Sequence, residues 1–102
     1  MTQRSLDDLT EEMADWIKWI LPARDPFDTA IKLVEETSEL LHALHHDEGN
    51  VAEECADILV LLLDVALLTG VDLQAAFEEK MEINRNRTWK LKQGCLTHET
   101  NR

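Results

Sequence analysis

The sequence is poor in the residues that build β-sheets and tight turns. It contains no tyrosine, two phenylalanines, three tryptophans, three glycines and two prolines among 102 residues. No stretch alternates apolar and polar residues as a half-buried strand does, and no Asn-Gly or Asp-Gly pair marks a hairpin. These absences, together with apolar residues at helical spacing, predict an all-α fold.

Positive charge is also scarce. The chain carries 10 lysines and arginines against 21 aspartates and glutamates, which gives a formal net charge of −11. Such a charge argues against a nucleic-acid polymer or an anionic membrane as a partner, because both repel an acidic protein. An anionic substrate would need a bound metal ion to offset this field.

Cysteines and long apolar runs are few. Cys55 and Cys95 stand far apart in the sequence, which indicates reduced thiols and not a disulfide framework. The N-terminal stretch MTQRSLDDLTEE has no apolar signal segment, and the longest apolar run, residues 58–63, is far too short for a membrane span. We therefore expect a cytoplasmic protein with one helical domain, residues 1–93, followed by a flexible tail, residues 94–102.

Four helices are predicted from the spacing of the apolar residues. They are expected to span about residues 6–21, 26–45, 51–69 and 73–87. Each predicted helix follows a residue whose side chain typically caps a helix N-terminus: Ser5, Asp25, Asn50 and Asp72. The third helix is apolar nearly all round from Cys55 onward, which is typical of a helix buried inside a domain or against another subunit.

The most informative residues lie in the second and third predicted helices. Each helix carries two carboxylates three residues apart, Glu36 with Glu39 and Glu54 with Asp57, and this spacing places both on one helix face. The two pairs are symmetric about the polar segment 46–50. A chain reversal there would make the helices antiparallel, with Glu36 level with Asp57 and Glu39 level with Glu54.

Four converging carboxylates predict a metal site. Like charges this close repel each other, so the group needs a cation or raised pKa values. Carboxylate oxygens suit a hard divalent ion, either Mg²⁺ or Mn²⁺, and Mg²⁺ commonly takes substrate phosphates as further ligands. Lys32 flanks the same helix edge as Glu36 and Glu39, whereas Glu35 points further outward.

Two more groups of residues are candidates for substrate binding. Lys80, Asn84 and Arg87 recur at helical spacing, so two cations and an amide share one face and could grip phosphate oxygens. The alternative is a solvated last turn whose cations favour the helix dipole. Trp16 and Trp19 in the first helix are explained by core or interface packing, or by stacking of one of them on a nucleotide base.

Two further features leave alternatives open. Glu39-Leu-Leu-His42 has the Glu-x-x-His pattern of di-iron helix bundles, but the third helix places Asp57 where a second histidine is required. Asp64 lies two turns beyond Asp57 on the same face of the third helix. It either supports the carboxylate cluster or pairs with a basic residue.

Three motifs in order carry a family resemblance: Glu35-Glu36-x-x-Glu39, Glu54-x-x-Asp57 and Lys80-x-x-x-Asn84-x-x-Arg87. They resemble the MazG-type nucleotide pyrophosphohydrolases, a group in the all-α superfamily of dimeric dUTPases and phosphoribosyl-ATP pyrophosphohydrolases. The match covers about residues 32–87, in a chain of the size of the compact single-domain members. The resemblance implies a four-helix unit with an antiparallel central helix pair, assembled as an intertwined homodimer or a dimer of dimers, with active sites near the dimer interface.

The resemblance also implies a reaction and its residues. The reaction would be Mg²⁺-dependent hydrolysis of (deoxy)nucleoside triphosphates to monophosphate and pyrophosphate, in the cleansing of nucleotide pools. Mn²⁺ is an expected substitute for Mg²⁺. Glu36 or Glu39 would activate the attacking water. The implied metal ligands are Glu36, Glu39, Glu54 and Asp57, with Glu35 as an additional acid at or behind them. The implied phosphate-binding residues are Lys80, Asn84, Arg87 and Lys32.

Other functions stay open from the residues alone. Within the same enzyme class, the substrate could be a nucleoside diphosphate or a phosphoribosyl nucleotide. In a different class, the chain would be a non-catalytic helical oligomerisation module, whose acidic clusters are surface charge or a structural ion site.

Overall fold

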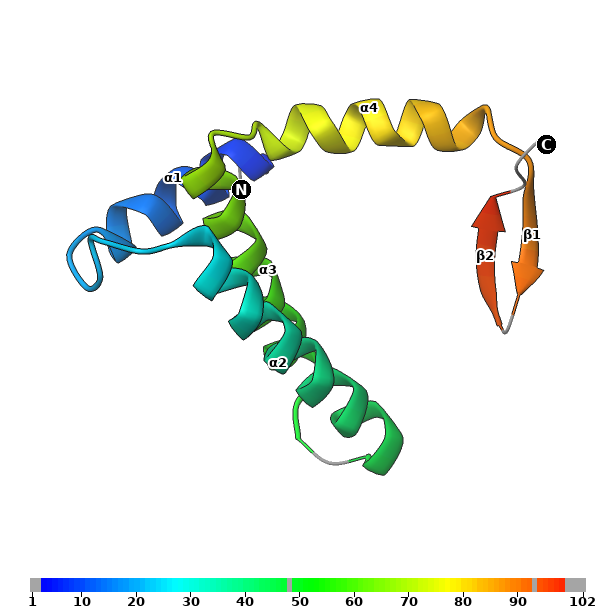
Figure 1. Cartoon of the computed structure of the whole chain (residues 1–102), viewed down its shortest axis with the longest axis horizontal. Coiled ribbons are helices and arrows are strands. Elements are labelled where there is room, and N and C mark those ends of the chain that lie inside the picture. Colours follow the sequence, from blue (N-terminus) through cyan, green and yellow to red (C-terminus); the bar gives the residue numbers. More distant parts are fainter. Residues whose placement is uncertain (1–2, 48, 93, 99–102) are drawn as a thin grey trace.

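The computed structural model describes residues 3–47, 49–92 and 94–98. It consists of four helices, α1 (Leu6–Ile17), α2 (Pro26–His46), α3 (Val51–Thr69) and α4 (Leu73–Arg85), followed by two short strands, β1 (Trp89–Lys92) and β2 (Cys95–His98) (Figure 1). The four predicted helices are therefore confirmed. All four predicted N-cap side chains accept a hydrogen bond from a backbone N–H of the first turn: Ser5, Asp25, Asn50 and Asp72.

The predicted end of the first helix is wrong by four residues. The helix ends at Ile17, and the next residues form a tight turn in which the backbone N–H groups of Ile20 and Leu21 both donate to the Ile17 carbonyl. The cause is Pro22, because a residue that precedes proline is driven away from helical backbone angles. The turn redirects the chain from α1 towards α2.

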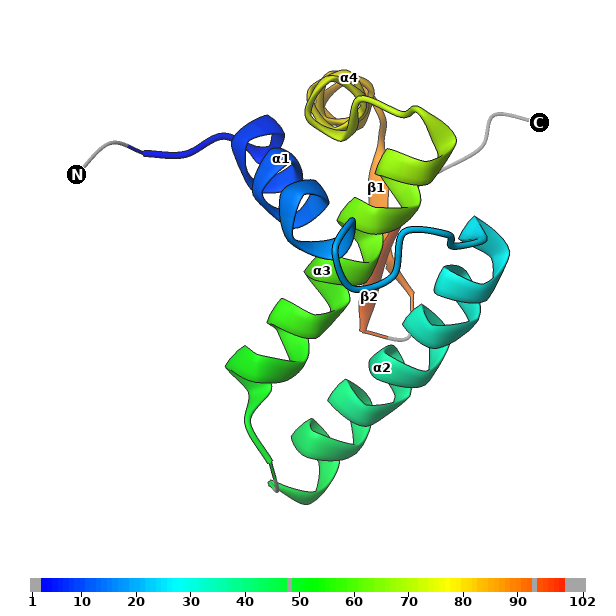
Figure 2. The same ribbon diagram turned by 90° about the vertical axis from the view of Figure 1, so that its left-hand side faces the viewer.

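Helices α2 and α3 form the antiparallel pair that the sequence predicted (Figures 1 and 2). The reversal between them contains Asp47, whose φ of 52° is left-handed and ends α2. The small core of the chain lies around α3. It contains Leu63 and Ala66 from α3, Ala43 from α2 and Met13 from α1.

A buried ion pair ties the α1–α2 linker to α3. Arg24 Nη2 lies 2.6 Å from Asp64 Oδ1, Arg24 Nε lies 3.0 Å from Asp64 Oδ2, and the two side chains are 8% and 5% exposed. Thr29 Oγ1 donates to the same carboxylate over 3.4 Å, and Arg24 Nη1 donates to the Leu21 carbonyl over 2.6 Å. Of the two roles open to Asp64, the structure therefore supports pairing with a base.

The strands β1 and β2 form an antiparallel hairpin that the sequence did not predict. Trp89 pairs with His98 and Lys92 with Cys95, and Gly94 adopts a left-handed φ of 78° in the connection. The indole N–H of Trp89 donates to the Asn84 carbonyl over 2.8 Å and fixes the hairpin to the end of α4. Each strand has only four residues, too few for alternation to show in the sequence. Residues 99–102 of the predicted tail lie outside the described residues.

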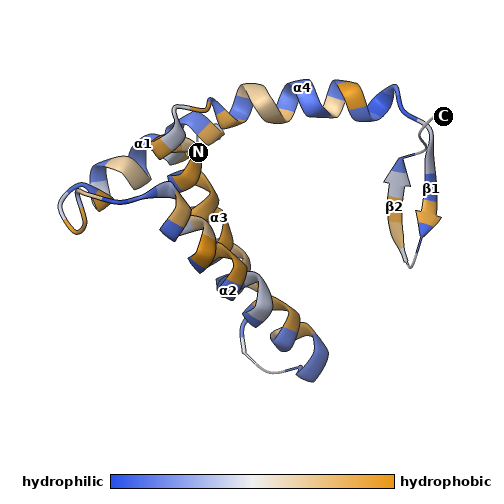
Figure 3. Cartoon of the chain, in the orientation of Figure 1, coloured by the Kyte–Doolittle hydropathy of each residue, from blue (hydrophilic) through white to orange (hydrophobic). Residues whose placement is uncertain are grey.

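Helix α4 and the hairpin form an arm, defined here as residues 73–98, that extends away from the α2–α3 pair (Figures 1 and 2). The radius of gyration is 16.3 Å, against about 13 Å for a compact domain of this length. Figure 3 shows apolar positions along α4 and on both strands, and Phe77 of α4, Leu91 of β1 and Leu96 of β2 are exposed. One chain alone thus leaves much of its apolar surface uncovered.

Among the described helices, none combines the length and the apolar character that crossing a bilayer requires. Cys55 and Cys95 are both free thiols, as predicted.

Candidate active site

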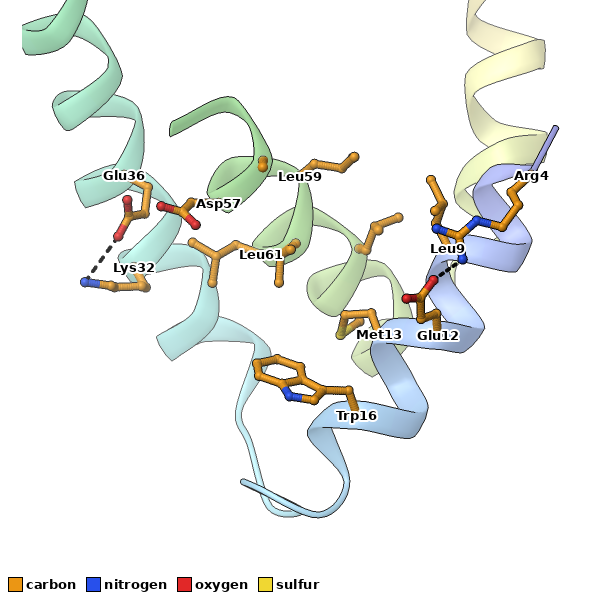
Figure 4. A pocket seen from close by; sticks show the side chains of 13 residues that line it. Arg4, Leu9, Glu12, Met13, Trp16, Lys32, Glu36, Asp57, Leu59 and Leu61 are labelled. Atoms are coloured by element: carbon orange, nitrogen blue, oxygen red, sulfur yellow. Dashed lines mark hydrogen bonds and ion pairs between the residues drawn. The ribbon is translucent and has the colours of Figure 1, made fainter. Parts of the chain in front are cut away.

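Three carboxylates from two helices meet in one group. Glu36 of α2 and Glu54 and Asp57 of α3 each offer an oxygen that lies within 4.8 Å of the others. Figure 4 shows Glu36 and Asp57 directed towards each other from the two helices. The antiparallel reversal therefore brings together residues that the i, i+3 spacing had placed on the facing helix sides. No histidine belongs to this group.

The electrostatics of Glu54 indicate a cation site. Its Oε2 is buried and has no hydrogen-bond partner in the described part of the chain. Desolvation raises the pKa of Glu54, and the nearby carboxylates of Glu39, Glu36 and Asp57 raise this pKa further. A buried, unpaired carboxylate oxygen among other carboxylates is costly unless a cation completes it. Because all the donors are carboxylate oxygens, the group fits a hard divalent ion.

Glu39 lies at the edge of this group and not within it. It is close enough to raise the pKa of Glu54, but its oxygens are not among the three that converge. Glu39 and Glu54 both line a second cavity of about 540 Å³, together with His42 and Gly49 at the end of the helix pair. The structure thus brings three of the four predicted metal ligands together and places the fourth beside them.

Lys32 connects the outer and inner acids of α2. Its Nζ lies 3.2 Å from Glu35 Oε2 and 3.4 Å from Glu36 Oε1. Hydrogen bonds to Glu35 and then to Glu36 raise the pKa of Lys32, so the ammonium stays charged. The Glu36 side chain is only 12% exposed, whereas Glu35 is exposed, as the sequence predicted. Lys32 therefore supplies one positive charge at the rim of the carboxylate group.

A groove of about 620 Å³ leads from the carboxylates between α1, α2 and α3 (Figure 4). Glu36, Asp57 and Lys32 lie at one end, and the middle is apolar. Trp16 belongs to this apolar lining, whereas Trp19 does not and is 82% exposed. The volume is in the range of small-molecule binding sites. Of the two candidate stacking residues, only Trp16 faces this groove.

The predicted phosphate-binding residues other than Lys32 are not near the carboxylates of the same chain. Helix α4 ends at Arg85, two residues before the predicted end, so Arg87 follows the helix. Lys80, Asn84 and Arg87 belong to the arm, which packs against α1 at its start and then leaves the α2–α3 pair (Figures 1 and 2). Asn84 Oδ1 is buried and lacks a hydrogen-bond partner among the described residues. Within one chain, Lys32 is the predicted phosphate-binding residue that reaches the carboxylate group.

Sequence reasoning missed two polar residues that line the groove, Arg4 and Glu12. Arg4 precedes the N-cap of α1, so no helical pattern includes it. Glu12 stands four residues before Trp16, on the same helix side, and this spacing is the one signal that could have identified it.

Comparison with known sequences agrees with this site. A family model described as the MazG nucleotide pyrophosphohydrolase domain matches residues 25–91. A dATP/dGTP diphosphohydrolase of Cyanophage S-2L is 40% identical over 92 residues, which are 89% of this chain and 85% of the relative. A protein of the same name from Salmonella phage PMBT28 is 35% identical over 95 residues, but these are only 31% of that longer protein.

Solved structures show the same fold. The Cyanophage S-2L MazG-like pyrophosphohydrolase, bound to dGDP and three catalytic Mn²⁺ ions per active site, is 37% identical, with a TM-score of 0.84 over 97% of both chains. The Bacillus-conserved MazG protein, a nucleotide pyrophosphohydrolase, is 25% identical, with a TM-score of 0.71 over 86% of this chain and 95% of that one. Sequence, fold and the carboxylate group agree that this chain is an enzyme of the MazG nucleotide pyrophosphohydrolase family.

Proposed function

We propose that this enzyme hydrolyses deoxynucleoside triphosphates to the monophosphate and pyrophosphate, with Mg²⁺ or Mn²⁺ as cofactor. The observation that carries the proposal is the group of Glu36, Glu54 and Asp57 at one end of a groove of nucleotide size. The names of the phage relatives favour dATP and dGTP as substrates. The buried, unpaired oxygen of Glu54 argues against a module whose acids are only surface charge.

The carboxylate group would hold the divalent cation, with Glu39 beside it and Glu35 further out. When bound, such a cation supplies charge neutralisation at the phosphates and makes water a stronger nucleophile. We propose that either Glu36 or Glu39, which both lie on the α2 side of the carboxylates, accepts the proton of the attacking water. Lys32 offsets negative charge where the phosphates approach.

Trp16 would form the apolar surface on which the base lies. Its aromatic side chain comes from α1 and lines the groove apart from the end that holds Glu36 and Asp57. Aromatic side chains stack on any base, so this contact would provide affinity with little discrimination.

We propose that the active enzyme is a homodimer or a dimer of dimers. The extended shape and the exposed apolar residues of the arm support an intertwined assembly. In such an assembly, the arm of one chain would bring Lys80, Asn84 and Arg87 to the carboxylates of its partner. There the two cations would bind and stabilise the leaving pyrophosphate.

The proposed setting is the cytoplasm, where nucleotides are available and thiols such as Cys55 and Cys95 stay reduced. Hydrolysis there would remove selected nucleotides from the pool. This role follows from the family resemblance and from the names of the relatives.

Pyrophosphate release tests the proposal. The four deoxynucleoside triphosphates and their ribonucleotide counterparts would each be assayed with Mg²⁺, with Mn²⁺ and with a chelator. We expect pyrophosphate and monophosphate from dATP and dGTP with either metal, and none with the chelator. Orthophosphate in place of pyrophosphate would mean that another bond is cut. No turnover of any nucleotide by a folded, metal-loaded oligomer would contradict the proposal.

A further inference from the structure

The groove has a second polar end, opposite the carboxylate group. Arg4 and Glu12 line it there, and Figure 4 shows them across the apolar middle from Glu36 and Asp57. Arg4 Nη1 and Glu12 Oε2 form an ion pair, which joins the segment before α1 to the second turn of α1. Hydrogen bonds with Ser5 lower the pKa of the Asp8 carboxyl, and the nearby charge of Arg4 lowers it a little further. The Arg4–Glu12 pair is thus part of the groove wall.

The Arg4–Glu12 ion pair contributes little to the stability of the fold. The two side chains are 56% and 62% exposed, and ion pairs as exposed as this one contribute little to the free energy of unfolding. Arg4 and Glu12 nevertheless lie beside the apolar side chains of Leu9 and Met13 in the groove lining. A charged pair at the end of an apolar groove is well placed to bind the polar edge of a ligand whose body occupies that groove.

The length of the groove, and the order of its acidic end, apolar middle and second polar end, fit a nucleotide that lies along it. On α3 the lining runs from Ala56 to Leu63, which is roughly 10 Å at the helical rise of 1.5 Å per residue. Phosphates at the carboxylate end would place the base over the apolar middle, beside Trp16. The base edge that points away from the sugar would then face Arg4 and Glu12.

The chemistry of this pair matches the edge of a purine. The ion pair uses one guanidinium nitrogen and one carboxylate oxygen, so further N–H donors and a second acceptor oxygen belong to the same two groups. Guanine and adenine each combine an exocyclic amino group, which donates, with ring or carbonyl atoms that accept. A pyrimidine is one ring shorter and reaches less far along the groove.

We propose that Arg4 and Glu12 form a subsite for the purine edge. Glu12 accepts hydrogen bonds from the exocyclic amino group, and Arg4 donates to the acceptor atoms of the base. The inference rests on the proposed function, because the phosphates must lie at the carboxylate group for the base to point this way. It adds a residue pair that determines which base is accepted.

The test compares two bases that differ only in the amino group. Inosine lacks the 2-amino group of guanine, so kcat/KM would be measured for pyrophosphate release from dGTP and from dITP. We expect wild type to prefer dGTP, and Glu12→Gln to reduce the ratio of the two kcat/KM values by about tenfold. The matched control is Glu11→Gln, on the exposed side of α1 outside the groove lining, which should keep the wild-type ratio.

A second variant measures the other half of the pair. Arg4→Gln should lower kcat/KM for dATP and dGTP about tenfold and change that for dCTP little, while the affinity for Mn²⁺ alone stays at the wild-type value. An unchanged dGTP-to-dITP ratio in Glu12→Gln, or an equal loss for both substrates, would overturn the inference, as would wild type that treats dGTP and dITP alike. Failure of the proposed function is distinct, because then wild type would release pyrophosphate from no triphosphate.

Discussion

The α2–α3 pair and the arm differ in whether the residues proposed to act together already lie together within one chain. In the helix pair, three carboxylates from two helices already converge, and the surrounding core is held by contacts with α1. In the arm, which carries Lys80, Asn84 and Arg87, α4 extends away from the α2–α3 pair of its own chain (Figure 1), and apolar residues such as Phe77 and Leu91 are exposed. We infer that folding forms the acidic half of the site, whereas assembly brings in the cationic half.

The largest expected effect is on the acidic half. Asp57→Asn replaces one of the three converging carboxylates by a neutral amide and keeps the shape of the side chain. We expect kcat to fall about 10³-fold, at the upper end of what loss of one electrostatic contact costs an active site. Steady-state pyrophosphate release would measure this effect, and circular dichroism would verify the helices.

The control for Asp57→Asn is Glu53→Gln, in the exposed first turn of the same helix. It makes the same change from acid to amide outside the converging group, so its activity should stay within about threefold of wild type. Full activity of Asp57→Asn would mean that the carboxylate group is not the metal site.

The next effect tests whether the two halves come from different chains. Arg87→Ala should lower kcat about 10²-fold through loss of a phosphate contact. Asp57→Asn and Arg87→Ala chains would carry different tags, be co-expressed, and be purified as mixed dimers. If the arm acts on its partner, each mixed dimer contains one intact site and one doubly defective site. We therefore expect activity to recover to about half of wild type per dimer.

The control for the mixed dimer is a pair of differently tagged Asp57→Asn chains, which should stay inactive. A mixed dimer as inactive as both parents would show that the cations and carboxylates of each site belong to one chain. In that case the arm would have to move against the α2–α3 pair of its own chain.

A third prediction concerns what holds the helix pair in place. Asp64→Asn removes the charge that balances Arg24, and both side chains are almost completely buried. Loss of one partner of a buried ion pair costs about 3–5 kcal/mol, so we expect a clear fall in the free energy of unfolding in urea. Asp15→Asn is the control, because its pair with Lys18 is exposed and should contribute at most about 1 kcal/mol. Equal effects of the two variants would contradict a structural role for the Arg24–Asp64 pair.

Local signals predicted that Glu36, Glu54 and Asp57 lie close together. These residues belong to one helical hairpin. Their i, i+3 spacing on each helix and their symmetry about the reversal at residues 46–50 are set by helix geometry, which decides which carboxylates meet. The helix starts were also predictable, because an N-cap side chain bonds to its own first turn.

Features that depend on contacts distant in sequence were not predictable. Arg24 and Asp64 are 40 residues apart, so no local pattern selects one as the partner of the other. The hairpin depends on Trp89 bonding back to Asn84 and on the left-handed Gly94, which leave little trace in so short a strand. The direction of the arm follows from the packing of α4 on α1, which helical periodicity does not specify.

The smallest expected effect concerns thermal stability. The charge of Glu54 should destabilise the fold without metal and stabilise it when Mn²⁺ is bound. Because its pKa is raised in the folded chain, the ionised Glu54 carboxylate destabilises the fold at neutral pH, and a neutral glutamine removes this repulsion. With a chelator present, Glu54→Gln should therefore raise Tm. Saturating Mn²⁺ stabilises whichever chain binds it more tightly, so wild type should then have the higher Tm. Thermal unfolding with and without Mn²⁺ measures this reversal, and Glu11→Gln should show neither shift. If Glu54→Gln lowered Tm without metal, the Glu54 carboxylate would have to be held by a favourable contact, and the cluster would not depend on a cation for its charge balance.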